Sequence, residues 1–202
     1  MVKVNLAFIP SFHDEGWVFC FCVHGGSKNG MKIIFITGGA RSGKSAFALL
    51  EASGRKGSKA YVATAEALDD EMKERIHKHK TGRGDDWDTY EEPLNIAGTL
   101  KDIKGNYKTI LLDCLTLWLS NTLLKSQQPE ESIEFFIDGL NSLNSVDGLH
   151  LYIVSNEVGM GIVPDNTLSR RFRDLAGTLN QRIAALADEV NLVIAGIPVK
   201  IK

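Results

Sequence analysis

Two short stretches of the sequence hold residue types that could do chemistry on phosphates. Residues 38–45 read GGARSGKS, in which glycines precede a lysine and a serine. Residues 75–83 read RIHKHKTGR, in which His77 and His79 stand two positions apart. Histidine changes its charge near neutral pH, so either ring could act as a nucleophile, a proton carrier or a metal ligand. The first stretch has a more definite chemistry than the second.

The stretch GGARSGKS matches the pattern G-x-x-x-x-G-K-[ST] and follows an apolar run that is typical of a buried strand. Glycines allow a tight turn in which successive N–H groups face one concavity and bind phosphate oxygens at a helix N-terminus. A lysine adds positive charge for the β- and γ-phosphates, and a serine hydroxyl can bind Mg²⁺. The predicted nucleotide-binding residues are Gly38, Gly39, Ala40, Arg41, Ser42, Gly43, Lys44 and Ser45.

A phosphate-binding loop usually works with a carboxylate at the end of another strand, which holds the magnesium, often through water. Asp113 ends the apolar run TILLD and is the best candidate. The alternative is that Asp113 caps the helix predicted for LTLWLSN, and one carboxylate at a strand end can serve both purposes. We therefore predict that Ser45 and Asp113 form the Mg²⁺ site.

Helical periodicity separates the two histidines of RIHKHKTGR. In a helix over residues 70–80, Met72 and Ile76 mark the buried stripe, and His79 lies three residues beyond Ile76 on the same side. His77 points toward solvent. Residues two apart on a helix also diverge, which disfavours a metal site made by the pair. A histidine beside an apolar stripe is more often a packing residue than a catalyst, so periodicity alone does not assign His79 a catalytic role.

Alternating apolar and amphipathic runs indicate the elements that must position these residues. Strands are predicted at 32–37, 59–64, 109–113, 149–155 and 190–196, and helices at 45–52, 70–80, 94–102, 115–124, 130–143 and 169–187. Strands that are apolar throughout and alternate with helices predict an α/β fold whose mainly parallel sheet is covered on both faces. Residues 125–148 carry the least information and are interpreted as a surface connection.

Composition limits the class of protein. The 202 residues suit one α/β domain, and a net charge of −2 disfavours a nucleic-acid or membrane-surface partner. No apolar run is long enough to span a membrane. Three cysteines are too few for a disulfide framework, so a reducing cytoplasm is the expected location. The first thirty residues lack the regular alternation that begins at Met31, and we predict a non-family leader over 1–30 and one domain over 31–202.

Longer strings carry a family resemblance. The strings GGARSGKS, YVATAEALDDEMKERIHKHKTGR, WDTYEEP, LLDCLTLWLSN, SNEVGMGIVPDNTLSRRFRDLAGTLNQRIAALADEV and AGIPVKIK follow one another in register from Met31 to Lys202. Together they resemble the bifunctional adenosylcobinamide kinase/adenosylcobinamide-phosphate guanylyltransferases. The resemblance implies a P-loop NTPase-like (RecA-like) three-layer fold with a mostly parallel central sheet.

The family's chemistry gives the histidine stretch a role. The resemblance implies that the protein phosphorylates adenosylcobinamide and then transfers GMP from GTP to adenosylcobinamide phosphate through a guanylyl-histidine. The family pattern R-I-x-x-H-x-x-x-R places the nucleophile at His79. Lys78 stands where some relatives have a second histidine, a departure without effect if His79 is the nucleophile. A covalent histidine splits one displacement at the α-phosphorus into two.

The remaining expectations follow from the same resemblance. Mg²⁺ is the expected cofactor, GTP and ATP are the expected nucleotide substrates, and a homotrimer is the expected assembly. Asn156, Glu157, Arg173, Asp174, Asn180 and Gln181 either shape the corrinoid side or a subunit contact, or else serve as helix caps and surface pairs. Glu91, in the pattern W-x-T-x-E, is similar to a nucleotide contact of the family or else belongs to an exposed acidic turn before Pro93. The further residues expected to contact nucleotide are Lys80, Thr81, Gly82 and Arg83, together with Ala63, Thr64 and Ala65, which follow the second strand where an α/β sheet offers a ligand crevice.

Two other classes of function remain open at this point. The first is a kinase without guanylyl transfer, which His79 together with Arg75 and Arg83 disfavours. The second is a nucleotide-dependent switch, which an additional interaction domain would favour and which no segment beyond the leader suggests. Label transfer from GTP to the protein would separate the bifunctional enzyme from both.

Overall fold

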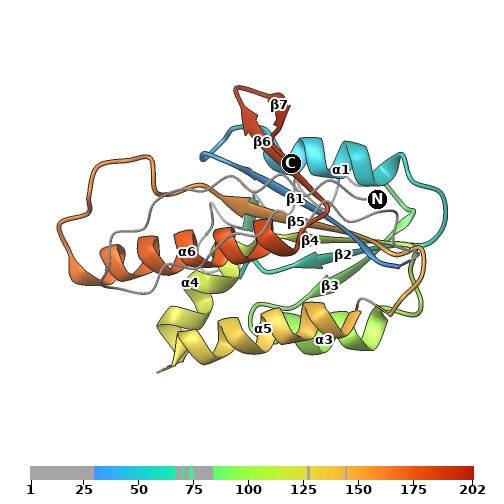
Figure 1. The fold of residues 1–202 in the computed structure, drawn as a ribbon, viewed down its shortest axis with the longest axis horizontal. Helices are drawn as coiled ribbons and strands as arrows, with labels where there is room; N and C mark the ends of the chain where they lie inside the picture. Colours follow the sequence, from blue (N-terminus) through green and yellow to red (C-terminus); the bar gives the residue numbers. More distant parts are fainter. Residues whose placement is uncertain (1–29, 67–69, 71–72, 75–83, 127, 144) are drawn as a thin grey trace, which may run out of the picture.

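A computed structural model describes residues 30–66, 70, 73–74, 84–126, 128–143 and 145–202. Strands and helices are interspersed along this part of the chain (Figure 1). The strands are β1 (Lys32–Gly38), β2 (Lys59–Ala63), β3 (Trp87–Glu91), β4 (Thr109–Asp113), β5 (His150–Asn156), β6 (Glu189–Ile194) and β7 (Ile197–Lys200). The helices are α1 (Lys44–Ser53), α3 (Ile96–Ile103), α4 (Leu115–Lys125), α5 (Pro129–Leu143) and α6 (Thr167–Leu186).

The seven strands form one sheet in the order β3-β2-β4-β5-β1-β6-β7. All neighbouring pairs are parallel except β6 and β7, which form an antiparallel hairpin at one edge. The phosphate-loop strand β1 therefore lies between β5 and β6, inside the sheet. The parallel strands all run the same way, so the residues that follow β1, β2 and β4 gather at the carboxyl ends of the strands. Ligands bind at this end of an α/β sheet.

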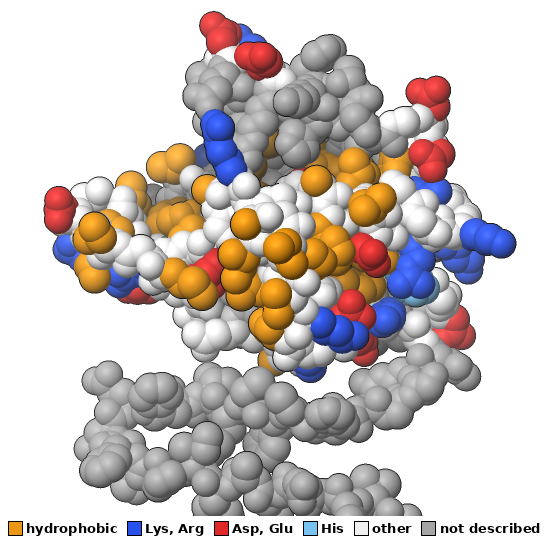
Figure 2. All heavy atoms as spheres, turned by 90° about the horizontal axis from the view of Figure 1, so that it is seen from above, with side chains coloured by type: hydrophobic (Ala, Val, Ile, Leu, Met, Phe, Trp, Pro, Cys, Tyr) orange, Lys and Arg blue, Asp and Glu red, His pale blue; other side chains and the backbone are white. Residues whose placement is uncertain are grey.

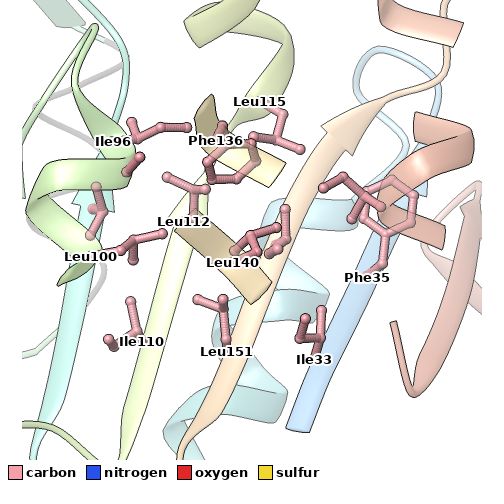
Figure 3. Close-up of a cluster of buried hydrophobic side chains, with 14 of the residues drawn as sticks. Ile33, Phe35, Ile96, Leu100, Ile110, Leu112, Leu115, Phe136, Leu140 and Leu151 are labelled. Carbon is pink, nitrogen blue, oxygen red and sulfur yellow. The ribbon is translucent and has the colours of Figure 1, made fainter. Parts of the chain in front are cut away.

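Helices cover both faces of the sheet, so the architecture has three layers (Figure 1). Helix α1 packs on one face through Ala48 and Ala52, against Ile36 and Val154 of the strands. Helices α3, α4, α5 and α6 cover the other face. Figure 3 shows Phe136 and Leu140 of α5 directed toward Leu112 and Leu151 of the sheet, within the larger buried cluster. The predicted α/β fold with a mostly parallel central sheet is confirmed.

Short polar signals set the helix ends. The side chain of Asn95 accepts a hydrogen bond from Gly98 N at the start of α3, and Asn166 accepts one from Ser169 N at the start of α6. These caps satisfy N–H groups that have no partner inside the helix. The first turn of α5 contains Glu130 and Glu131, whose negative charges suit the positive end of the helix dipole.

Two expectations about the elements were wrong or incomplete. Residues 125–148 are not a surface connection, because α5 buries Ile133, Phe136, Ile137, Leu140 and Leu143 in the main cluster. Strands β3 and β7 were not predicted. Both lie at the edges of the sheet, where a strand does not need to be apolar throughout. The predicted helix over 70–80 lies mostly outside the described residues, and so do His77 and His79.

Exposed apolar side chains collect on the β6–β7 hairpin. The exposed residues are Ile194, Ile197, Val199 and Ile201. Figure 2 views the molecule from the side where this hairpin lies in Figure 1 and shows hydrophobic side chains gathered on that face. A second exposed apolar group, Met160, Ile162 and Val163, lies in the loop between β5 and α6. Within the described ranges, no helix has the length and apolar character needed to cross a membrane.

Candidate active site

The loop between β1 and α1 has the backbone geometry of an anion-binding concavity. Arg41 and Gly43 adopt positive φ angles of 56° and 93°, and the chain then enters α1 at Lys44. Such alternation of left- and right-handed residues directs successive N–H groups to one side. The Lys44 ammonium donates a hydrogen bond to Gly39 O at 3.1 Å, so the lysine side chain curls back over the loop. The residues that the motif named thus form a loop whose shape suits a phosphate, and their role in nucleotide binding stays a prediction.

The phosphate loop contacts the turn between β6 and β7. Gly196 N donates to Ser42 O at 2.8 Å, and a Cβ atom on Gly43 would lie 3.1 Å from the Cα of Gly196. A Cβ atom on Gly38 would lie 2.4 Å from Val193 O. The phosphate loop therefore rests directly on the β6–β7 turn, and Gly38 has to be a glycine because a carbonyl occupies the space of any side chain.

Asp113 lies beside the loop, as predicted. Ser45 Oγ donates to Asp113 Oδ1 at 3.3 Å, and the hydroxyl of Tyr61 donates to Asp113 Oδ2 at 2.7 Å. Asp113 does not cap α4, because the N-cap residue is Cys114 and it makes no side-chain cap hydrogen bond. The capping interpretation of Asp113 is therefore wrong, and the carboxylate is available to the loop side.

The pairing of Ser45 with Asp113 fits a magnesium site. A hydroxyl and a carboxylate are hard oxygen donors, and Mg²⁺ takes one or two such protein ligands while phosphates and water complete its octahedron. In the described part of the chain, no group of three or more His, Cys, Asp or Glu side chains could hold a metal ion. A site with few protein ligands that relies on nucleotide phosphates is the kind that this arrangement supports.

The strand register places other residues predicted to contact nucleotide at the same carboxyl ends of the strands. Ala63 is paired with Asp113 on one side and with Glu91 on the other, so these three residues lie in one row across β4, β2 and β3. Gly38 is paired with Asn156 in the neighbouring part of the edge. Ala63 and Ala65 are half-buried, and Glu91 is exposed at the end of β3.

Thr64 has a structural partnership. Its hydroxyl donates to Cys114 O at 2.7 Å and accepts from Cys114 N at 2.9 Å, and its side chain is fully buried. Asn121 of α4 donates to Thr64 O at 2.9 Å. These bonds tie the end of β2 to the residue that follows Asp113. The side chain of Thr64 thus fixes the position of the Asp113 strand end.

Cys114 is not available as a nucleophile. Burial raises the pKa of its thiol to about 11, and the neighbouring charge of Asp113 acts in the same direction. A thiol with this pKa stays protonated at neutral pH, and the thiolate is the reactive form. We therefore do not assign the Cys114 thiol a catalytic role.

Several residues singled out by the family resemblance make hydrogen bonds or ion pairs within the protein. Asn180 Nδ2 donates to Asn156 O at 3.0 Å, Glu157 Oε1 accepts from Gly159 N, and Arg173 pairs with its neighbour Asp174. Glu157 N also donates to Gly38 O at 3.0 Å, which places the end of β5 against the start of the phosphate loop. The bond between Arg173 and Asp174 agrees with the interpretation of a surface pair. Asn180 is neither a cap nor a surface residue, because it is buried inside α6 and ties that helix to the end of β5.

Part of the predicted site lies outside the described residues. This part consists of His79, Lys80, Thr81, Gly82 and Arg83, so their roles stay predictions. Sequence reasoning also missed two described residues, Tyr61 and Gly196. The signal for Gly196 was the dipeptide Ala-Gly after an apolar run, which is typical of a turn. Tyr61 stands inside an apolar run, and no local signal marks its hydroxyl.

Comparison with known families gives one match over most of the chain. The model of the family described as cobinamide kinase / cobinamide phosphate guanyltransferase matches residues 34–201. This range includes the phosphate loop, Asp113 and the β6–β7 hairpin.

Curated relatives and solved structures complete the comparison. A bifunctional adenosylcobalamin biosynthesis protein, CobU, of Salmonella typhimurium is 43% identical over 183 residues, covering 84% of this chain and 99% of the relative. CobP of Pseudomonas aeruginosa, which carries the same description, is 42% identical over 169 residues, covering 83% of this chain and 95% of the relative. The RadB recombinase structure has a TM-score of 0.47 at 13% identity, covering 80% of this chain and 73% of that one. A KaiC-like protein of Pyrococcus horikoshii has a TM-score of 0.41 at 14% identity, covering 80% and 71%.

Proposed function

Because the chain belongs to the cobinamide kinase / cobinamide phosphate guanyltransferase family, we propose that it catalyses both transfers at one phosphate site and that the second passes through His79. The corrinoid substrates are adenosylcobinamide and its phosphate, and the product is adenosyl-GDP-cobinamide. The observation that carries the proposal is that Ser45, the last residue of the phosphate-loop motif, contacts Asp113 at the carboxyl ends of the strands. This arrangement can hold a nucleoside triphosphate for either reaction.

The kinase step needs positioning and charge neutralisation more than covalent chemistry. Loop N–H groups and the Lys44 ammonium bind the β- and γ-phosphates of ATP or GTP. Ser45 and Asp113 would hold Mg²⁺, which supplies positive charge to the phosphate oxygens when it is bound. The hydroxyl of adenosylcobinamide attacks the γ-phosphorus, the bond from that phosphorus to the β-phosphate oxygen breaks, and the nucleoside diphosphate leaves.

The guanylyl step needs a nucleophile that reaches the α-phosphorus. A neutral imidazole nitrogen of His79 attacks the α-phosphorus of GTP, a nitrogen–phosphorus bond forms, and pyrophosphate leaves. A phosphate oxygen of adenosylcobinamide phosphate then attacks the same phosphorus and releases the imidazole. The connection that contains His79 leaves the sheet after Ala63, beside Asp113, which supports a reach to the nucleotide. Arg83 would stabilise the phosphate charges.

Labelling of the protein tests this route. The full chain is incubated with GTP labelled at the α-phosphate and Mg²⁺, in the absence of a corrinoid. We expect a protein-bound label that is stable in base and labile in acid, as phosphoramidates are. The label is expected to disappear in His79→Ala and to remain in His77→Ala, the matched control two residues away.

The outcomes separate the alternatives. Label that persists in His79→Ala would remove the assignment of the nucleophile. A wild-type protein that transfers the γ-phosphate to adenosylcobinamide but takes no label from GTP would be a kinase without guanylyl transfer. Lys44→Ala is expected to remove both activities, because both need the triphosphate on the loop.

The assembly and location of the protein are also proposals. The family resemblance supports a homotrimer and a cytoplasmic enzyme. Sedimentation equilibrium tests the first, with an expected mass three times that of the 22.2-kDa chain. Cell fractionation with an antibody against the chain tests the second.

A further inference from the structure

Tyr61 places a phenol hydroxyl against the carboxylate at the proposed magnesium site. Tyr61 lies in β2 opposite Leu111 of β4, and Ala63 lies opposite Asp113 two residues later. Residues two apart on a strand share a face, so Tyr61 and Asp113 point to the same side of the sheet. The Tyr61 hydroxyl donates to Asp113 Oδ2 at 2.7 Å. Tyr61 is 5% exposed, so the donor of this bond is buried, while Asp113 is half-buried.

The two oxygens of Asp113 therefore have different neighbours. Oδ1 accepts from Ser45 Oγ, the hydroxyl that the loop motif assigns to the metal, whereas Oδ2 is bound by Tyr61. We propose that Tyr61 is a positioning residue, which holds Oδ2 and so presents Oδ1 to the bound Mg²⁺. The inference rests on the magnesium site in the proposed function. It adds a residue that the loop motif does not contain.

The phenol ring is itself held in place. The Tyr61 ring meets the ring of Trp87 edge to face, with centroids 6.3 Å apart and an angle of 80° between the planes. Trp87 is buried in β3, the strand that pairs with β2 on the side away from β4. A ring packed in this way cannot turn its hydroxyl away from Asp113 without displacing Trp87. The orientation of the carboxylate is thus set by aromatic packing across three strands.

Loss of the hydroxyl has two opposing effects on metal affinity. Without the hydrogen bond, more negative charge stays on the carboxylate, which attracts Mg²⁺ more strongly. The carboxylate is also released to rotate, and Mg²⁺ demands a nearly ideal octahedral geometry. Partners behind a metal ligand change affinity by about 10- to 100-fold when they are removed, so we expect the loss of orientation to dominate.

The test measures metal-linked nucleotide binding instead of turnover. A GTP analogue with a methylene group between the α- and β-phosphorus cannot release pyrophosphate, so it binds without reacting. Calorimetric titration of the full chain is run in EDTA and at a series of MgCl₂ concentrations. In Tyr61→Phe we expect the MgCl₂ concentration at half-effect to rise about 10-fold, with the affinity in EDTA unchanged.

Two variants make the readout specific. Tyr152→Phe deletes the other phenol hydroxyl of the same buried cluster, whose partner is Arg55 Nε at 3.0 Å, and it is expected to leave the MgCl₂ dependence unchanged. Asp113→Asn removes the carboxylate that Tyr61 holds. Adding Tyr61→Phe to Asp113→Asn is therefore expected to have no further effect on the MgCl₂ dependence.

The outcomes distinguish this inference from the proposed function. An unchanged MgCl₂ dependence in Tyr61→Phe overturns the positioning role while the wild-type metal dependence stands. An equal shift in Tyr61→Phe and Tyr152→Phe, or a loss of affinity in EDTA, shows general loosening of the cluster and also overturns it. A wild-type protein whose analogue binding does not respond to MgCl₂ removes the magnesium site, and with it this inference.

Discussion

A single hydroxyl, that of Thr64, serves both backbone groups of Cys114 and thereby fixes the strand end that carries Asp113. Thr64→Val keeps the shape of the side chain and leaves a buried N–H and a buried C=O without this partner. We expect the free energy of unfolding to fall by about 1–3 kcal/mol, measured by urea denaturation. Thr109→Val is the matched control, because Thr109 is equally buried and its hydroxyl has no partner among the described residues. An equal loss in both variants would contradict the argument.

Gly38 gives a second prediction at the scale of one residue. In Gly38→Ala the new Cβ meets Val193 O and the Ser42 side chain at less than van der Waals distance, and a backbone carbonyl cannot move aside cheaply. We expect a loss of about 1–3 kcal/mol in the free energy of unfolding and weaker binding of GTP. Gly39→Ala is the control for stability, because a Cβ there meets nothing within 4 Å. We expect it to change the free energy of unfolding by less than about 0.5 kcal/mol. If the two variants are equally stable, the close approach at Gly38 does not matter.

At the scale of elements, the β6–β7 turn supports the phosphate loop. Gly196 has a φ of +81°, which costs a residue with a side chain about 1–2 kcal/mol. Gly196→Ala is expected to lower stability by this amount and, because Gly196 N binds Ser42 O, also to weaken GTP binding. Gly148 has a similar φ of +72° just before β5, at the amino ends of the parallel strands and so at the end of the sheet opposite to the phosphate loop. Gly148→Ala is therefore expected to lower stability without changing GTP affinity, and calorimetric titration compares the two.

The elements also show how far the sequence alone could lead. Five strands were predicted because their apolar runs are largely buried, and the loop motif named Lys44 and Ser45, which the structure places at the start of α1 beside Gly39 and Asp113. The edge strands β3 and β7 escaped because exposed edges allow polar residues and even Pro198. Helix α5 was misplaced on the surface because its polar approach, SQQPEES, hid the apolar stripe that follows. Tyr61 could not be found because its partner, Asp113, is distant in sequence and near only in the folded sheet.

At the scale of the whole molecule, stability is expected to depend on pH in two windows. Hydrogen bonds from Arg182 and Arg171 lower the pKa of Glu134 and Glu130, so their contribution is present above the ordinary value of 4.5 and is lost as the pH falls below it. The pKa of His150 is lowered by burial and by the nearby charges of Arg55 and Lys32. The unfolded chain therefore binds the His150 proton more readily, and stability rises with pH just below 6.5.

His150→Gln separates the second window from the first. Urea unfolding is measured between about pH 5 and 8 for the wild type and the variant. The rise in stability below pH 6.5 is expected to flatten in His150→Gln, while the loss at more acidic pH remains. All other residues are the same in both proteins, so the difference between the two curves reports His150. Parallel curves would show that His150 is not a source of the pH dependence.

The position of β1 in the sheet has a consequence for biosynthesis of the chain. The ribosome makes β1 and the phosphate loop early, but the strands that flank β1, β5 and β6, are made late. The turn that carries Gly196 emerges after both of these strands. Contacts between distant parts of a chain form slowly, since the intervening segment has to be ordered first. A nascent chain therefore has no assembled nucleotide site until the residues up to Gly196 have left the ribosome, so nucleotide cannot assist the earlier steps of its folding.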